Sequence, residues 1–196
     1  MDREERRDEF LRLMYGEMWN NINRHLTVTW QAVGVVAAGF AVFLGIADKN
    51  PSMIDAAAGL MIIVSGWLLS HIYDANTWFN RNLGIIANIE RQFLAKNDAA
   101  EIQFYFTEPH RRRLLSHLRV QRDFGLAAAV LVLVTHFLVR VLPGIHEPWD
   151  HFDPIRTLPY LAVLGCIWWV GYSRREQRES VDEFVIKSPG RTVKEE

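Results

Sequence analysis

The sequence is nearly without cysteine, and its charges almost cancel. Cys166 is the single cysteine among 196 residues, so no disulfide can form within one chain. Lys and Arg number 22 and Asp and Glu 23, which gives a formal net charge of -1 and no overall attraction for DNA. A glycine-rich phosphate loop, a hydrolase nucleophile elbow and a paired-carboxylate arrangement are also missing. These absences argue against a disulfide-rich secreted domain, a DNA-binding protein and the common enzyme classes.

Charge is also missing locally. Four stretches contain no Asp, Glu, Lys or Arg: residues 26–47, 56–73, 124–139 and 157–173. A helix needs roughly 20 residues to cross about 30 Å of hydrocarbon, and the first stretch has that length. The second reaches it by including Met53 and Ile54, and the third by continuing to Leu142 while Arg140 extends its charge outward. The sequence therefore predicts an all-α integral membrane protein with four transmembrane helices.

The fourth stretch has an alternative interpretation as a buried or interfacial hairpin. Its end carries Trp168, Trp169 and Tyr172, followed by Arg174 and Arg175. Aromatic residues next to arginines are typical of a span that is anchored at the membrane surface, so we include this stretch among the spans.

The basic residues predict the orientation, because Lys and Arg are retained on the cytoplasmic side of short loops. Of the 22 basic residues, 19 lie before residue 26, between residues 74 and 123, or after residue 173. Only Lys49, Arg140 and Arg156 remain for the two outer connections. Both termini are therefore expected in the cytoplasm, most simply at a bacterial inner membrane. The charged amino terminus shows no cleavable signal, so the first span is expected to act as a signal anchor.

These features divide the chain into five segments. They are a cytoplasmic amphipathic arm (1–25), a first transmembrane hairpin (26–73), a cytoplasmic helical extension (74–123), a second transmembrane hairpin (124–173) and a flexible cytoplasmic tail (174–196). Apolar residues recur every three or four positions in the arm, which predicts an amphipathic helix leading into the first span. That helix is expected to pack against another cytoplasmic helix of the chain or to lie among lipid headgroups.

The cytoplasmic extension is predicted to consist of helices that continue the spans. Ile72, Phe79, Ile86 and Phe93 recur every seven residues without a stop signal, so one helix should continue from the second span to about residue 96. A further helix is predicted to open at Thr107, before Glu108-Pro109, and to run without a break into the third span.

Polar residues at the inner ends of the first two spans form the first group of candidate site residues. They are predicted to line an inner vestibule or a polar seam between subunits: Gln31, His71, Asp74, Asn80, Arg81 and Asn88. Asp74, Arg81 and Asn88 share one helical face at seven-residue spacing. The outer halves of these spans are apolar, which fits either a hydrophobic constriction or a protein that conducts nothing.

The densest positive cluster forms the second group, located where a helix is expected to enter the membrane: Arg111, Arg112, Arg113, His117 and Arg119. Attraction to anionic lipid headgroups is one interpretation, and binding of a phosphate-bearing ligand or RNA is the other. Arg112 and His117 also have the R-x4-H spacing of HEPN ribonucleases and resemble that motif.

No metal or cofactor is expected. His71 and His136 are predicted to form hydrogen bonds between helices rather than to carry protons or bind metals. The His, Glu and Asp residues between positions 146 and 153 match no established metal site. Small residues are expected to bring helices together, within the chain or between copies, through Ala37, Ala41 and Gly45 and through Gly125 and Ala129.

The architecture between Met14 and Phe93 resembles that of the SLATT-type small transmembrane effectors of bacterial conflict systems. The resemblance lies in the long arm, the two spans and the second helix that continues through the sequence YDANTWFNRN at residues 73–82. The chain is also similar to the small four-pass subunits that some anti-phage systems pair with a cytosolic protein. Both resemblances imply a membrane protein that assembles with itself and, once triggered, impairs the membrane.

Three functions follow as hypotheses. The first is a non-enzymatic, homo-oligomeric membrane effector or gated pore, whose cytoplasmic helices receive a signal from a cytosolic protein or a phosphate-bearing ligand. The second is a non-conducting anchor in the bilayer that recruits a cytosolic partner. The third is an enzyme that acts through Arg112 and His117, although no enzymatic activity is expected from the sequence as a whole.

Overall fold

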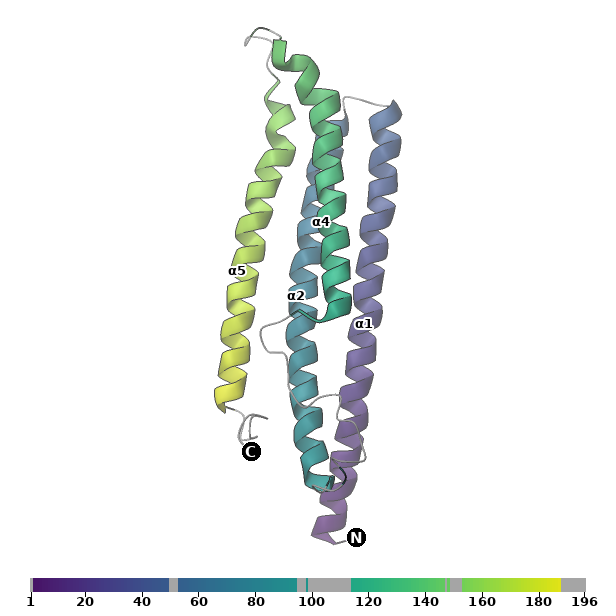
Figure 1. The fold of residues 1–196 in the computed structure, drawn as a ribbon, viewed down its shortest axis with the longest axis vertical. Coiled ribbons are helices and arrows are strands. Elements are labelled where there is room, and N and C mark those ends of the chain that lie inside the picture. Colours follow the sequence, from purple (N-terminus) through teal and green to yellow (C-terminus); the bar gives the residue numbers. More distant parts are fainter. Residues whose placement is uncertain are drawn as a thin grey trace.

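The computed structural model describes residues 2–49, 53–94, 98, 114–146, 148 and 153–187. Four long helices dominate it: α1 (Arg3–Lys49), α2 (Ile54–Phe93), α4 (Ser116–His136) and α5 (Leu158–Lys187) (Figure 1). A π-helical turn, η2 (Phe137–Val141), and a 3-10 turn, η3 (Leu142–His146), extend α4, and a second 3-10 turn, η5 (Pro154–Thr157), precedes α5. The described residues contain no strand, which confirms the predicted all-helical class.

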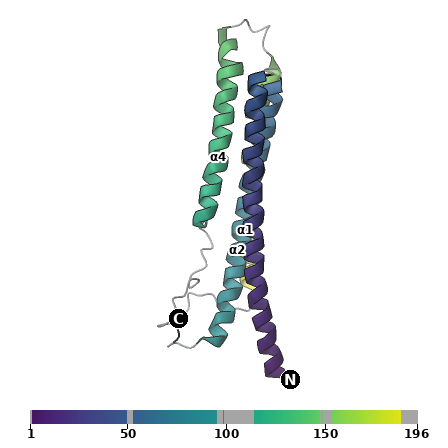
Figure 2. The same cartoon turned by 90° about the vertical axis from the view of Figure 1, so that its right-hand side faces the viewer.

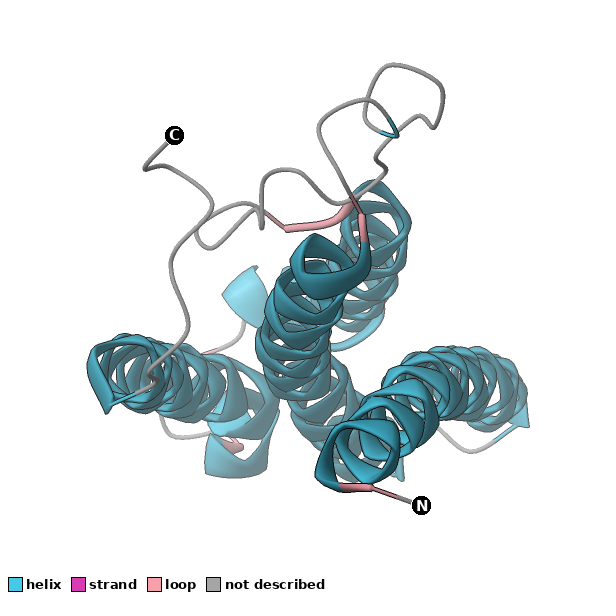
Figure 3. Cartoon of the chain, turned by 90° about the horizontal axis from the view of Figure 1, so that it is seen from below, coloured by secondary structure: helices cyan, strands magenta, loops and turns pink. Residues whose placement is uncertain are grey.

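The helices alternate in direction, so the start of α1 and the end of α5 lie at the same end of the bundle (Figure 1). α2 is the central helix, and α1, α4 and α5 each pack against it (Figure 3). Its position explains why α2 contributes the largest share of the buried core, including Leu68 and Ile72, whereas α1 contributes Val36 and Phe43.

Three helices are long and apolar enough to cross a membrane: Arg3–Ala47, Ile54–Phe93 and Ser116–Ile145. They support the prediction of a membrane protein. α5, which contains the predicted fourth span, is not among them. The apolar part of α5 ends at Ser173 and includes Trp, Tyr and Gly residues, whose hydropathy is lower than that of Leu or Val.

α1 and α2 both extend well beyond their charge-free stretches. α1 has 47 residues and α2 has 40, so they are about 70 and 60 Å long, roughly twice the hydrocarbon thickness. They lie side by side for much of this length (Figure 2). The Tyr15 hydroxyl donates to Glu90 (3.1 Å), and the His25 ring stacks on Trp78 with 5.7 Å between centroids. The amphipathic arm therefore packs against the continuation of α2 in the same chain.

α4 begins later than the sequence predicts. Leu114 and Leu115 are not helical, so the predicted unbroken helix through Arg119 is wrong at this point. The Leu115 N–H donates to the side-chain oxygen of Asn76 on α2 (3.3 Å), a contact that replaces a bond to a preceding helical carbonyl. A tertiary contact, absent from any local pattern, therefore accompanies the start of α4 at Ser116. Positions 99–113, including the predicted start at Thr107, lie outside the described residues.

Small residues allow close contacts on α2 and α4, whereas Gly45, in the predicted small face of α1, is uncovered. A Cβ at Gly66 would lie 2.6 Å from the Sγ atom of Cys166, and one at Gly125 would lie 3.0 Å from Leu68. These glycines let α5 and α4 approach α2, and the small side chain of Cys166 packs against Gly66. A Cβ at Gly45 would meet nothing within 4 Å, so the predicted small face of α1 is not used within the chain.

Candidate functional site

One face of α2 is only partly covered by the three surrounding helices. α4 covers the opposite side, through contacts of Gly125 with Leu68 and of His117 with Phe79, while α1 and α5 lie on the two flanks (Figure 3). The uncovered residues recur every three or four positions, as one helical face requires. We call this surface the open face of α2, and its residues are Leu60, Ile63, Trp67, Asp74, Trp78 and Arg81. Trp78 and Arg81 remain exposed although they contact His25 of α1 and Phe184 of α5, and Asp74 is half-buried.

The open face changes from apolar to polar along the helix. Leu60 and Ile63, 62% and 49% exposed, lie near the connection to α1, whereas Asp74 and Arg81 lie toward the end that packs on the arm. The Arg81 guanidinium lies 4.9 Å from the ring centroids of both Trp78 and Phe184, so aromatic rings of α2 and α5 hold its charge. Of the three residues predicted at seven-residue spacing, Asp74 and Arg81 lie on this face.

The other members of the first predicted group are dispersed. Asn88 is half-buried further along α2, and Gln31 is exposed on α1. Asn80 is buried, and its amide donates to the Asn76 carbonyl of its own helix (2.8 Å). The His71 ring stacks on Trp67 with 5.7 Å between centroids, and within the described part of the chain its Nε2 atom has no hydrogen-bond partner. The interhelical hydrogen bond expected of His71 is therefore not formed through Nε2.

The predicted positive cluster is only partly described, because Arg111, Arg112 and Arg113 lie outside the described residues. His117 packs edge-on against Phe79 of α2, with 5.4 Å between centroids. Arg119 is exposed, and its side chain donates to the Leu114 carbonyl (3.0 Å), where it covers the start of α4. His117 and Arg119 thus have different surroundings, and the structure does not bring them together.

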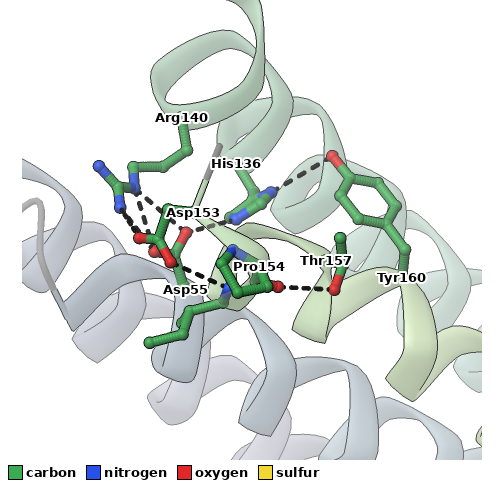
Figure 4. A network of polar contacts seen from close by, with 8 residues as sticks. Asp55, His136, Arg140, Asp153, Pro154, Thr157 and Tyr160 are labelled. Carbon is green, nitrogen blue, oxygen red and sulfur yellow. Dashed lines mark hydrogen bonds and ion pairs between the residues drawn. The ribbon is translucent and has the colours of Figure 1, made fainter. Parts of the chain in front are cut away.

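A buried charge cluster joins the helices at the opposite end of the bundle, and the sequence did not predict it. We define it by the residues Asp55, His136, Arg140, Asp153 and Tyr160 (Figure 4). The carboxylate of Asp55 is only 1% exposed. It accepts from Nε2 of His136 and from Nη2 of Arg140, each at 2.8 Å. His136 and Arg140 are four residues apart, so they share a face and reach the same carboxylate.

The remaining contacts complete the network around Asp55. Nε of Arg140 donates to the same carboxylate (3.1 and 3.2 Å), and Asp153 lies 3.6 Å from Nη2. Nδ1 of His136 lies 3.3 Å from the Tyr160 hydroxyl. A neutral His136 with its proton on Nε2 donates to Asp55 and accepts from Tyr160. The cluster therefore ties the first turn of α2 to α4, to the π-helical turn η2 and to α5.

This cluster corrects one expectation and confirms another. The sequence predicts that Arg140 extends its charge outward, but its side chain is 19% exposed and turns inward to Asp55. His136 forms the predicted interhelical hydrogen bond, to Asp55 of α2. The sequence did contain a signal for the ion pair. Asp55 directly precedes the second charge-free stretch and Arg140 directly follows the third, so the predicted topology places both charges at the same depth.

The chemistry of the cluster is that of a structural ion pair. A charge buried among apolar residues is costly unless it is paired and hydrogen-bonded, and Asp55 meets both conditions. Among the described residues, no group of three or more His, Cys, Asp or Glu side chains could hold a metal ion. The cluster thus holds the ends of three helices together, while the open face of α2 remains available for other contacts.

The chain was compared with models of protein families, with curated proteins and with solved structures, and none of them matches.

Proposed function

We propose that this protein is a homo-oligomeric membrane effector, a gated pore in which the open face of α2 lines the axis. The main observation in support is that this face changes from apolar to polar along the helix. Leu60 and Ile63 lie toward one end, and Asp74 and Arg81 lie toward the other. Apolar side chains around a narrow axis exclude water and keep a pore closed, and polar groups at one mouth hold water beside that constriction.

The proposal places the chain in a bacterial inner membrane with four spans and both termini in the cytoplasm. The alternating helix directions and the 19 basic residues on the side of the termini support this placement. α5 is the fourth span, with Trp168, Trp169 and Tyr172 at the cytoplasmic surface. The buried charge cluster then lies at the outer surface, where it joins the two hairpins.

Surfaces without a partner support self-association. In the membrane, the small face of α1 around Gly34 and Gly45 meets nothing in the same chain, and small residues are what bring transmembrane helices together. Outside it, Phe10 and Leu13 of the arm are exposed although no lipid covers them there. A second copy or a cytosolic partner protein would remove these apolar side chains from water.

The continuous helices supply a route for the signal. α1 and α2 have no break between the arm and the spans, and they contact each other outside the membrane through Tyr15 and Glu90. A displacement of the arm by a bound protein or phosphate-bearing ligand is therefore passed to the spans as a rigid-body movement. Movement of α2 about its axis would turn Ile63 away from the pore.

The test uses one polar substitution at the proposed constriction and the same change elsewhere. Ile63→Asn hydrates the open face, so we expect purified protein in liposomes to conduct potassium ions at least tenfold faster than the unaltered protein. Val130→Asn on α4 is the matched control, because Val130 is also exposed but lies on another helix, and it should leave the flux unchanged. The protein should be oligomeric by mass in detergent.

The alternative function is the non-conducting anchor. Exposed Phe10 and Leu13 would then bind only the cytosolic partner. If no polar substitution along the open face changes ion flux and the purified protein is a folded monomer, the pore is refuted and the anchor takes its place.

A further inference from the structure

The buried face of α4 carries a polar side chain near each end. Its buried residues are Leu118, Gln121, Gly125, Ala128, Val132 and His136. At the outer end, where the buried charge cluster lies, both ring nitrogens of His136 contact polar partners. Near the start of the helix, Gln121 is 1% exposed, and within the part of the chain that the structure describes neither its Nε2 nor its Oε1 atom has a hydrogen-bond partner. One polar side chain is therefore satisfied, and the other is not.

The part of α2 opposite Gln121 is apolar. α4 contacts α2 at Leu68 and at Phe79, on either side of Gln121 along the helix. Between these two positions the same face of α2 presents Ile72 and Ala75, which are both buried. The amide of Gln121 has thus lost water without gaining hydrogen bonds, and a buried polar group in this condition destabilises the packing around it.

Further polar atoms without partners lie at the same end of α4. The Nε2 atom of His117 is buried and has no hydrogen-bond partner in the described part of the chain. The same holds for Oδ1 of Asn80, which lies one turn from Asn76 on the same face of α2. Asn76 itself accepts a long hydrogen bond, 3.3 Å, from the N–H of Leu115. The start of α4 has no side-chain cap either. Polar groups at this inner end therefore gain little from the packed arrangement.

Gln121 is buried but lies close to water. It comes three residues before the third charge-free stretch, toward the end of the bundle that holds both chain termini, and its neighbours Val120 and Asp123 are exposed. A small separation of α4 from α2 at this end would give the amide hydrogen bonds to water. The same separation at the outer end would break a buried ion pair, which is far more costly.

We propose that α4 moves between two positions while the buried charge cluster holds its outer end on α2. In the second position the inner end of α4 separates from α2 and Gln121 is hydrated. The unpartnered amide favours this movement, because it forms hydrogen bonds only after the separation. The inference goes beyond the proposed gating by α2, since it makes α4 a second moving part, and it does not depend on whether the protein conducts ions.

The test measures the reaction of a buried cysteine with a water-soluble maleimide in the full-length protein in detergent, in a Cys166→Ser background. Leu118→Cys reports on the inner end of α4. Ile86→Cys is the matched reporter, because it is equally buried, at 0% exposure, but lies on α2 beyond the start of α4. The rate follows the population of the open form when opening is fast, so we expect Leu118→Cys to react at least tenfold faster than Ile86→Cys.

A second substitution tests the cause. Gln121→Leu has a similar size but no amide to hydrate, so it should slow the reaction of Leu118→Cys at least fivefold and leave that of Ile86→Cys unchanged. Gln31→Leu is the control, because it makes the same change at an exposed position of α1, and it should alter neither rate. Equal rates at the two reporters, no slowing by Gln121→Leu, or the same slowing by Gln31→Leu would each overturn the proposal.

A distance measurement keeps the proposal testable if Leu118→Cys does not fold. Spin labels at Val120 of α4 and Thr27 of α1, both exposed, should show two distances that Gln121→Leu reduces to one. Labels at Leu138 of η2 and Leu60 of α2, also exposed, should show a single distance, because the charge cluster holds the outer end. A single distance at the inner end, or two at the outer end, would refute the movement.

Discussion

The buried charge cluster should determine much of the stability of the helix bundle, and Asp55→Asn tests this. The substitution keeps the shape of the side chain but removes its charge. Arg140 then loses the carboxylate that accepts from both Nε and Nη2, and His136 keeps at most one acceptor. The positive charge of Arg140 is left largely buried, and among the described residues the remaining nearby carboxylate is that of Asp153, at 3.6 Å.

The expected cost follows from this geometry. Removing one partner of a buried ion pair reduces the free energy of unfolding by about 3–5 kcal/mol. Because the Arg140 side chain is 19% exposed and Asp153 is within reach, we expect the lower end, about 3 kcal/mol. This corresponds to a change of roughly 150-fold in the unfolding equilibrium constant. Asp153→Asn, at an exposed and more distant carboxylate, should cost less than about 1 kcal/mol.

The measurement is reversible unfolding in mixed detergent micelles, followed by circular dichroism, for a double-mutant cycle of Asp55→Asn and Arg140→Gln. The two changes together should cost less than the sum of the single changes, by about 1–3 kcal/mol, because the second removes the charge that the first leaves unpaired. Additive effects, or a loss below about 1 kcal/mol for Asp55→Asn, would mean that the pair does not hold the helices together.

Two further predictions concern packing and topology. Gly66→Ala should reduce the free energy of unfolding by about 1–3 kcal/mol, because the added Cβ would lie 2.6 Å from the sulfur of Cys166. Gly45→Ala is the control and should cause no such loss, because its Cβ meets open space. Equal losses in the two variants would contradict the packing of α5 on α2. A reporter that is active only in the periplasm should be silent when fused after Asp98 and active when inserted near Pro148, and the reverse pattern would end the four-span topology.

Much of the fold follows from local sequence alone. The four charge-free stretches predict apolar helices because burying unpaired charge in hydrocarbon is prohibitive, and three long apolar helices are present. The seven-residue spacing of Ile72, Phe79 and Ile86 predicts one continuous helix, and α2 runs unbroken from Ile54 to Phe93. Both signals depend only on neighbouring residues, which is why composition and periodicity reveal them.

The candidate sites depend on which helix faces meet, and only the tertiary structure decided that. Asp55 and Arg140 are 85 positions apart, and their pairing requires a particular register between α2 and α4. The contact of Asn76 with Leu115 lies at the start of α4, which begins later than its local pattern predicts. The seven-residue spacing predicts that Asp74 and Arg81 share one face of α2. It does not predict which face of α2 the other helices leave exposed. That choice is made by close packing between helices, a sum of many weak contacts that no local pattern contains.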